Sequence, residues 1–184
     1  QDQIEWDKVL VTLGGRYDWA DQESYNRVLN TTAKRDDTQF TWRGGVNYLF
    51  DNGITPYFSY SESFEPISGT TQGGKPFDPA RGKQYEAGVK YVPKDLPVVV
   101  TAAVYQLTKN NNLTADPANP TSGFSVQGGE IRSRGFELEA KAAVSANVNV
   151  TAAYSYTDAE YTHDTWYEGR RPAEVPRNMA SLWA

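Results

Sequence analysis

Long stretches in which apolar and polar side chains alternate constrain this chain more than any other feature of its sequence. In "RGFELEAKAAVSANVNVTAAYSYT", residues 134–157, the alternation runs on both sides of a tight turn. One face of this pair of segments carries Phe136, Leu138, Val150 and Tyr154, and the other is polar. A period of two residues predicts β-strands with one wet and one dry face. The dry face must be covered by a second sheet or by lipid.

The connections between the predicted strands alternate between short and long. Strands are expected over residues 8–19, 40–50, 54–64, 83–91, 98–108, 134–143 and 148–157, an eighth begins at 177, and residues 1–4 end an earlier strand. Short turns are expected near 5–8, 51–53, 92–97 and 144–147, and long loops near 20–38, 65–82, 109–128 and 160–176. Membrane β-barrels place short turns at the periplasmic rim and long loops outside the cell. We therefore predict an all-β fold, a transmembrane antiparallel β-barrel.

Aromatic side chains, 13% of the chain, gather near both ends of these strands. The band near the short turns comprises Trp6, Tyr48, Phe50, Tyr57 and Tyr91. The band near the long loops comprises Tyr17, Trp19, Phe40, Trp42, Phe64, Tyr85, Tyr154 and Tyr156. Two such bands are typical of the aromatic girdles at the two membrane interfaces, although aromatic residues also simply favour strands. The dry face is therefore predicted to meet lipid.

The wet face is then predicted to line a water-filled lumen. Its charged wall comprises Arg43, Glu86, Lys90, Glu137, Glu139 and Lys141, with Arg16 further along. A wide barrel lets water solvate such charges, whereas a narrow one would have to pair them. Residues 98–108 are apolar on both faces, and we expect Tyr105 and Leu107 to point outward because Gln106 and Thr108 suit water.

Aromatic residues in the long loops are the best candidates for contact with a ligand or partner. They are Phe77, Phe124, Tyr161, Trp166 and Tyr167. Aromatic side chains exposed near Arg170 and Arg171 suit an interface. The alternative, that these loops pack on one another, carries at least equal weight.

Catalytic, metal-binding and nucleic-acid-binding roles find little support. A net charge of −5 disfavours a nucleic-acid-binding surface, and the absence of cysteine excludes thiolate sites. The single histidine, His163, lies near Ser155 and Asp164 in sequence, but a nucleophile also needs a base oriented by a third group. Glu137 and Glu139 fit a hydrated wall better than a catalytic pair. We expect no catalytic residue, no metal site and no cofactor.

Four segments have a distinctive sequence: "LGGRYDW" at 13–19, "YFSYSESFEP" at 57–66, "GKQYEAGVKY" at 82–91 and "RSRGFELEAKAAVSANVNVTAAYSYTDAEY" at 132–161. These segments resemble the TonB-dependent outer-membrane siderophore receptors, and within them the receptors for ferric hydroxamates of the ferrichrome type. The resemblance covers essentially the whole chain in one register, and it is strongest in strands and short turns.

The resemblance implies a barrel of about 22 strands with a plugged lumen. Such a receptor binds a ferric siderophore outside the cell and releases it inward after the protein TonB engages the plug. Iron arrives as cargo inside its chelator, so no side chain has to bind it. Further implied partners are the lipid and lipopolysaccharide of a Gram-negative outer membrane, and phages or bacteriocins at the loops. This chain would supply about eight consecutive strands from the C-terminal half, without plug or TonB-binding segment.

Three other interpretations remain open from the residues alone. The chain could form a complete eight-stranded outer-membrane barrel with a structural or adhesive role. It could be an outer-membrane hydrolase that uses His163. It could also be a soluble β-sandwich that acts as a binding module.

Overall fold

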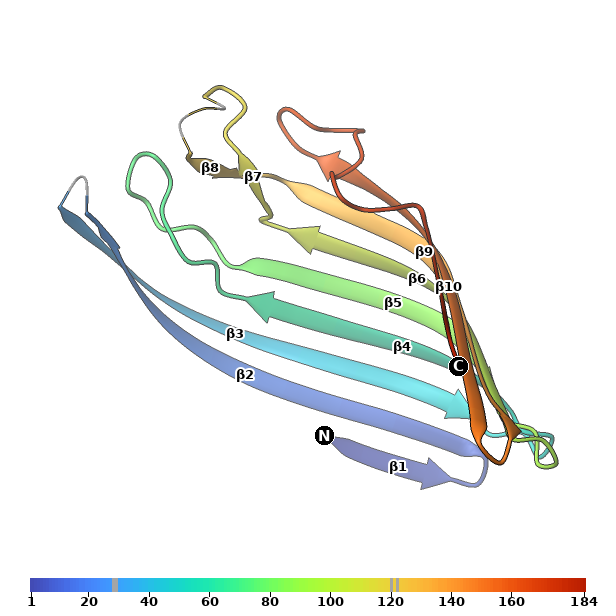
Figure 1. The fold of residues 1–184 in the computed structure, drawn as a ribbon. Coiled ribbons are helices and arrows are strands. Elements are labelled where there is room, and N and C mark those ends of the chain that lie inside the picture. The colour runs from blue at the N-terminus through green and yellow to red at the C-terminus, as the bar shows by residue number, and fades with distance from the viewer. Residues whose placement is uncertain (28–29, 120, 122) are drawn as a thin grey trace.

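Nine strands of the chain form one antiparallel sheet (Figure 1). The computed structural model describes residues 1–27, 30–119, 121 and 123–184, so residues 28–29, 120 and 122 of two predicted loops lie outside the described residues. The strands are β1 (Asp2–Trp6), β2 (Val9–Asn26), β3 (Thr31–Tyr48), β4 (Ile54–Glu65), β5 (Ala80–Tyr91), β6 (Val98–Asn110), β9 (Glu130–Ser145), β10 (Val148–His163) and β11 (Asn178–Trp183). Each pairs with its neighbour in this order. A separate two-stranded sheet joins β7 (Leu113–Ala115) and β8 (Ser125–Gln127).

The described residues include no helix of the length and apolarity that a membrane crossing requires.

One face of the nine-stranded sheet is apolar and uncovered. The strand registers place on it large apolar side chains whose exposed fractions run from 42% to 58%: Leu13, Phe40, Val46, Phe58, Val89, Val104, Phe136 and Leu138. None of the described residues has a large side chain that is fully buried. A soluble sandwich would cover such a face with a second sheet. The β-sandwich interpretation is therefore wrong.

The sheet is also open. In the described part of the chain, β1 pairs only with β2 and β11 only with β10, so the two edges do not meet. A complete eight-stranded barrel closes its first strand on its last and leaves no edge. The interpretation of the chain as a complete small barrel is therefore wrong as well.

The hairpin turn between β3 and β4 forms as its Asn-Gly sequence predicts. Gly53 has φ of +84°, a value that favours glycine over residues with a Cβ. The main-chain N–H of Phe50 donates to the carbonyl of Ile54 at 3.0 Å, and that of Ile54 donates to Oδ1 of Asn52 at 3.1 Å. The carbonyl of Gly53 accepts the N–H of Val92 at 2.9 Å, which links this turn to the next one.

The strands run further on the long-loop side than their sequence pattern indicates. Residues 20–26 and 31–38, predicted as parts of a loop, extend β2 and β3 and pair continuously up to Asn26 and Thr31. β5 likewise begins at Ala80, and β10 continues to His163. Polar side chains on both faces erase the period-two pattern without weakening the backbone pairing. The loop predicted at 109–128 contains the β7–β8 hairpin, which the sequence analysis did not predict.

Rings on the apolar face form rows across neighbouring strands. Trp42, Tyr60 and Tyr85 follow one another across β3, β4 and β5, with ring centroids 4.6 Å and 4.9 Å apart. Nearer the short turns, the rings of Tyr48 and Phe50 lie 4.6 Å apart. Tyr57 does not belong to this band, because it pairs with Asn47 and Gly88 on the polar face.

Candidate functional site: the polar face and the outer loops

The six predicted wall residues share one face of the sheet, which we call the polar face. They are Arg43, Glu86, Lys90, Glu137, Glu139 and Lys141. Directly paired residues of antiparallel strands lie on the same side of a sheet. Lys90 pairs with Thr101, and Thr101 pairs with Glu139, so these three form one row. Glu139 and Lys141 form an ion pair at 2.6 Å. Assignment of this face to the lumen remains a prediction.

Tyr57 and Glu86 form a polar cluster at the centre of this face. The Tyr57 hydroxyl donates to Oε1 of Glu86 at 2.7 Å, and Nε2 of Gln84 donates to Oε2 at 2.9 Å. The Tyr57 ring lies over Gly88, where an added Cβ would come within 2.6 Å of the ring. Each oxygen of the Glu86 carboxylate thus has its own donor.

Tyr105 belongs to the polar face, so its predicted outward orientation is wrong, and so is that of Leu107. Tyr105 pairs with Glu86 and Gly135, and its hydroxyl lies 2.9 Å from Oγ1 of Thr157. The ring passes over Gly135, which has no side chain, to reach the next strand. Gln106 and Thr108, which share the face of Tyr85, are the outward residues of β6 instead.

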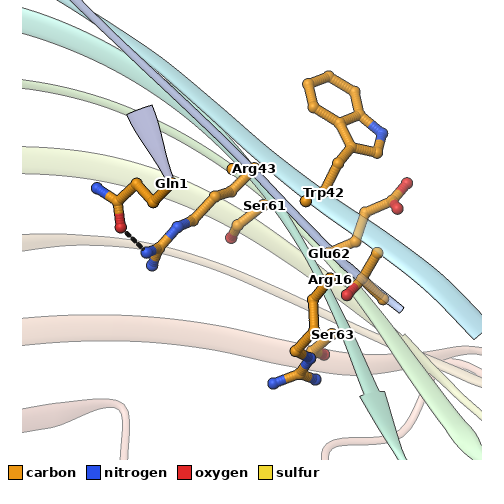
Figure 2. Close-up of a pocket in the computed structure, with 10 residues that line it drawn as sticks. Gln1, Arg16, Trp42, Arg43, Ser61, Glu62 and Ser63 are labelled. Atoms are coloured by element: carbon orange, nitrogen blue, oxygen red, sulfur yellow. Dashed lines mark hydrogen bonds between the residues drawn. The ribbon is translucent and has the colours of Figure 1, made fainter. Parts of the chain in front are cut away.

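A pocket at the β1–β4 end of the sheet contains two arginines. Figure 2 shows Arg43 directed towards Gln1, to which its guanidinium donates a hydrogen bond, and Trp42 on the other side of the strand. Arg16 lines the same pocket and donates from Nε to Oδ2 of Asp18 at 2.8 Å. On the polar face, this pocket therefore contains Arg43 and the arginine of the Arg16–Asp18 ion pair, and Glu62 also lines it.

The five candidate loop aromatics do not form one cluster. Phe77 is only 4% exposed, which favours the alternative of packing between loops over a ligand contact. Tyr161 and Tyr167 are half-buried, with ring centroids 5.6 Å apart, and burial raises the pKa of Tyr161. Phe124 is half-buried as well. Trp166 is 55% exposed and remains a candidate contact.

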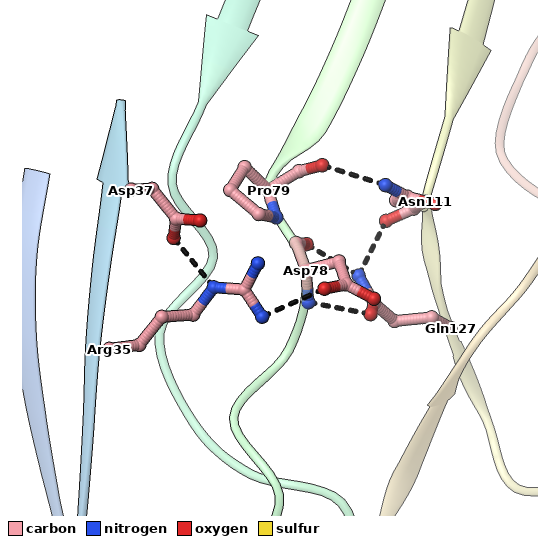
Figure 3. A network of polar contacts seen from close by, with 6 residues as sticks. All are labelled: Arg35, Asp37, Asp78, Pro79, Asn111 and Gln127. Atoms are coloured by element: carbon pink, nitrogen blue, oxygen red, sulfur yellow. Dashed lines mark hydrogen bonds and ion pairs between the residues drawn. The ribbon is translucent and has the colours of Figure 1, made fainter. Parts of the chain in front are cut away.

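A network of polar residues connects the outer end of β3 with the outer loops, and the sequence did not predict it (Figure 3). Arg35, near the outer end of β3, forms ion pairs with Asp37 and Asp78, each at 2.7 Å. The hydrogen bonds that the Arg35 guanidinium donates to these two carboxylates, the one to Asp37 above all, raise its pKa. Gln127 and Asn111 continue the network from the far side of the 66–79 loop. An arginine and an aspartate about forty residues apart give no local pattern.

The residues of the hydrolase hypothesis do not come together. Ser155 and His163 lie on the same strand, eight residues apart, which corresponds to about 26 Å at the rise of a β-strand. The Asp164 carboxylate instead accepts the main-chain N–H groups of Trp166 and Tyr167, both at 2.8 Å. The hydrolase interpretation is wrong for this arrangement. The described residues hold no group of three or more potential metal ligands of the His, Cys, Asp and Glu types.

Comparisons with known proteins agree with the architecture. Residues 1–184 match the family described as "TonB dependent receptor-like, beta-barrel". The chain is 73% identical, over its full length and 24% of the relative, to the "Ferrichrome outer membrane transporter/phage receptor" of Escherichia coli K12. It is 40% identical to the "Ferrioxamine B receptor" of Salmonella typhimurium LT2, covering 26% of that protein.

Among solved structures, the siderophore receptor PiuA of Acinetobacter baumannii superimposes with a TM-score of 0.74 at 24% identity, over 96% of this chain and 28% of that one. The outer-membrane ferripyoverdine receptor of Pseudomonas aeruginosa gives 0.74 at 19% identity, over 98% and 24%. At such identities these likenesses show the fold. The chain spans about a quarter of the length of the curated relatives named above. It belongs to the TonB-dependent receptor family and forms part of a β-barrel in the outer membrane of a Gram-negative bacterium.

Proposed function

We propose that the complete receptor containing this chain imports ferric hydroxamate siderophores of the ferrichrome type. The observation that carries the proposal is the 73% identity, without a gap in coverage, to a relative named for ferrichrome transport. Identity falls to 40% for the relative named for ferrioxamine B. The family membership, rather than any missing catalytic group, makes the chain part of a receptor and not of an enzyme.

In this proposal the two faces of the sheet have separate tasks. The apolar face, with Leu138 and Val104 at its centre, meets lipid, and the polar face lines the path of the ligand. Iron is the cargo and stays inside its chelator, so recognition falls to polar and aromatic side chains rather than to metal ligands. Energy comes from TonB, which acts on plug segments outside this chain.

Uptake of radiolabelled ferric ferrichrome tests the proposal. The complete receptor, produced in a Gram-negative strain that lacks its own ferrichrome receptor, should restore uptake at least tenfold over the empty strain. Deletion of TonB in the same strain should abolish that gain. Ferric ferrioxamine B serves as the matched ligand. Equal uptake of both siderophores would contradict the assignment to ferrichrome. Uptake that persists without TonB would contradict the proposed TonB-dependent mechanism.

A second candidate role is attachment of a phage or bacteriocin to the outer loops. Two observations favour it: the Escherichia coli relative is named as a phage receptor, and Trp166 is exposed on the 160–176 loop. Large aromatic side chains are enriched at the centre of protein interfaces. Phage plating on the uptake strain described above tests this role separately from transport.

A further inference from the structure

The side chains of Arg35 and Gln127 bind the same residue of the 66–79 loop, Asp78, from opposite sides (Figure 3). Arg35 reaches from β3, and its Nη1 lies 2.7 Å from Oδ1 of Asp78. Its Nε is held by Asp37 at 2.7 Å, which fixes the direction of the guanidinium. The side chains of Arg35 and Asp37 are only 23% and 13% exposed, so this ion pair is shielded from water more than a surface pair.

Gln127 binds the main chain of Asp78 rather than its carboxylate. Oε1 of Gln127 accepts the N–H of Asp78 at 2.7 Å, and Nε2 donates to the carbonyl of Asp78 at 2.6 Å. A side-chain amide that pairs with both polar groups of one residue reproduces the two hydrogen bonds of a paired strand residue. The loop is therefore joined to the β7–β8 hairpin as a strand would be.

Further hydrogen bonds connect the 66–79 loop to the residues around the β7–β8 hairpin. Nε2 of Gln127 also lies 3.2 Å from the carbonyl of Asn111, and Nδ2 of Asn111 donates to the carbonyl of Pro79 at 2.9 Å. Phe77 is 4% exposed and Ala80 is 1% exposed, so apolar burial flanks the polar contacts on both sides of Asp78. The Asp78 side chain is 48% exposed, whereas Arg35 and Asp37 are more shielded, and hydrogen bonds in such a partly shielded network support one another. We call Arg35, Asp37, Asp78, Asn111 and Gln127 the outer clasp.

We propose that Arg35 and Gln127 are positioning residues that join the outer end of β3, the 66–79 loop and the β7–β8 hairpin into one pre-formed unit. These segments then open and close together, and the outer surface that they form needs no separate ordering of each loop when a partner binds. The proposal concerns the coupling between loops and does not depend on which ligand the receptor carries.

Amide hydrogen exchange of the complete receptor, followed by mass spectrometry, tests this coupling. Arg35→Gln should raise exchange at least tenfold in residues 69–78. It should also raise exchange in residues 113–127, although the ion pairs of Arg35 among the described residues are with Asp37 and Asp78. Gln127→Ala should raise exchange in both segments as well. The double variant should exchange no faster than the faster single variant, because both changes open the same unit.

Arg16→Gln is the matched control. Arg16 forms an ion pair with Asp18, two positions further on, at 2.8 Å. Arg35 forms the same kind of ion pair with Asp37. No described loop residue pairs with Arg16, so its replacement should leave exchange in 69–78 and 113–127 unchanged. Unchanged protection of β4 and β5 in each variant verifies that the barrel has folded.

Two outcomes would overturn the proposal. In the first, Arg35→Gln accelerates exchange only at residues 35–37 and 78, and the hairpin keeps its protection. In the second, the effects of the two single changes multiply in the double variant, as they do for independent contacts. Neither readout uses siderophore uptake, so failure of the transport assignment would leave this test intact.

Discussion

Replacement of Leu138 by arginine should lower the free energy of unfolding of the complete receptor barrel in lipid by about 2–4 kcal/mol. Leu138 lies near the middle of β9 on the apolar face and is 46% exposed in this chain. If that face meets lipid, the guanidinium must sit near the middle of the hydrocarbon layer, where hydration is lost. A urea titration of the barrel folded into phospholipid vesicles measures the change.

The neighbouring residue provides the matched control. Glu137 is adjacent in sequence but lies on the polar face, where it pairs with Ala103 and Ser155. Glu137→Gln keeps the shape and removes the charge, and it should change the free energy of unfolding by less than about 0.5 kcal/mol. The opposite order of the two effects would mean that the polar face is the one turned to lipid.

Replacement of Gly135 by alanine should also destabilise the barrel, by about 1–3 kcal/mol. A Cβ at this position would lie 2.2 Å from the main-chain oxygen of Tyr156 and 2.8 Å from the Tyr105 hydroxyl. The first contact is with the backbone of a paired strand, which cannot move without disturbing the β9–β10 ladder. The same urea titration, applied to this variant, measures the loss.

Gly88→Ala is the matched comparison, because its added methyl group would clash with a side chain rather than with the backbone. A Cβ at Gly88 would lie 2.6 Å from the Tyr57 ring, a side chain that can swing away at the expense of its hydrogen bond to Glu86. The cost should therefore be close to that of one hydrogen bond, about 1 kcal/mol. An equal or larger loss for Gly88→Ala than for Gly135→Ala would contradict this account of the two glycines.

The sequence predicted the facing of most strands because a period of two residues is a local signal. Along β9, Phe136 and Leu138 lie on the apolar face and Glu137 and Glu139 on the polar face, as predicted. The Asn-Gly turn at residues 52–53 is another local signal that the structure confirms.

Where the prediction failed, the deciding partner lies on another strand or loop. Strand register places Tyr57 and Tyr105 on the polar side, and glycines on neighbouring strands, Gly88 and Gly135, leave room there for their rings. No single segment reveals such a pairing, since register becomes visible only in the folded sheet. Phe77 is buried for the same kind of reason, because its loop packs on other parts of the molecule.

The outer loops show a second limit of pattern analysis. The outer halves of β2 and β3 carry polar side chains on both faces, so their continuous pairing leaves no trace in hydropathy. The outer clasp brings together Arg35 of β3, Asp78 of the 66–79 loop and Gln127 of β8. Contacts between residues so far apart in the sequence depend on the tertiary structure and not on local propensity.

The central claim is that the apolar face meets lipid while the polar face meets water, and spin labels placed along β9 test it most directly. The chain has no cysteine, so single cysteines can be introduced from Phe136 to Lys141 in the complete receptor. In lipid bilayers, labels at Phe136, Leu138 and Ala140 should collide frequently with oxygen and rarely with a water-soluble nickel complex. Labels at Glu137, Glu139 and Lys141 should show the reverse. Loss of this alternation, or its inversion, would contradict the account.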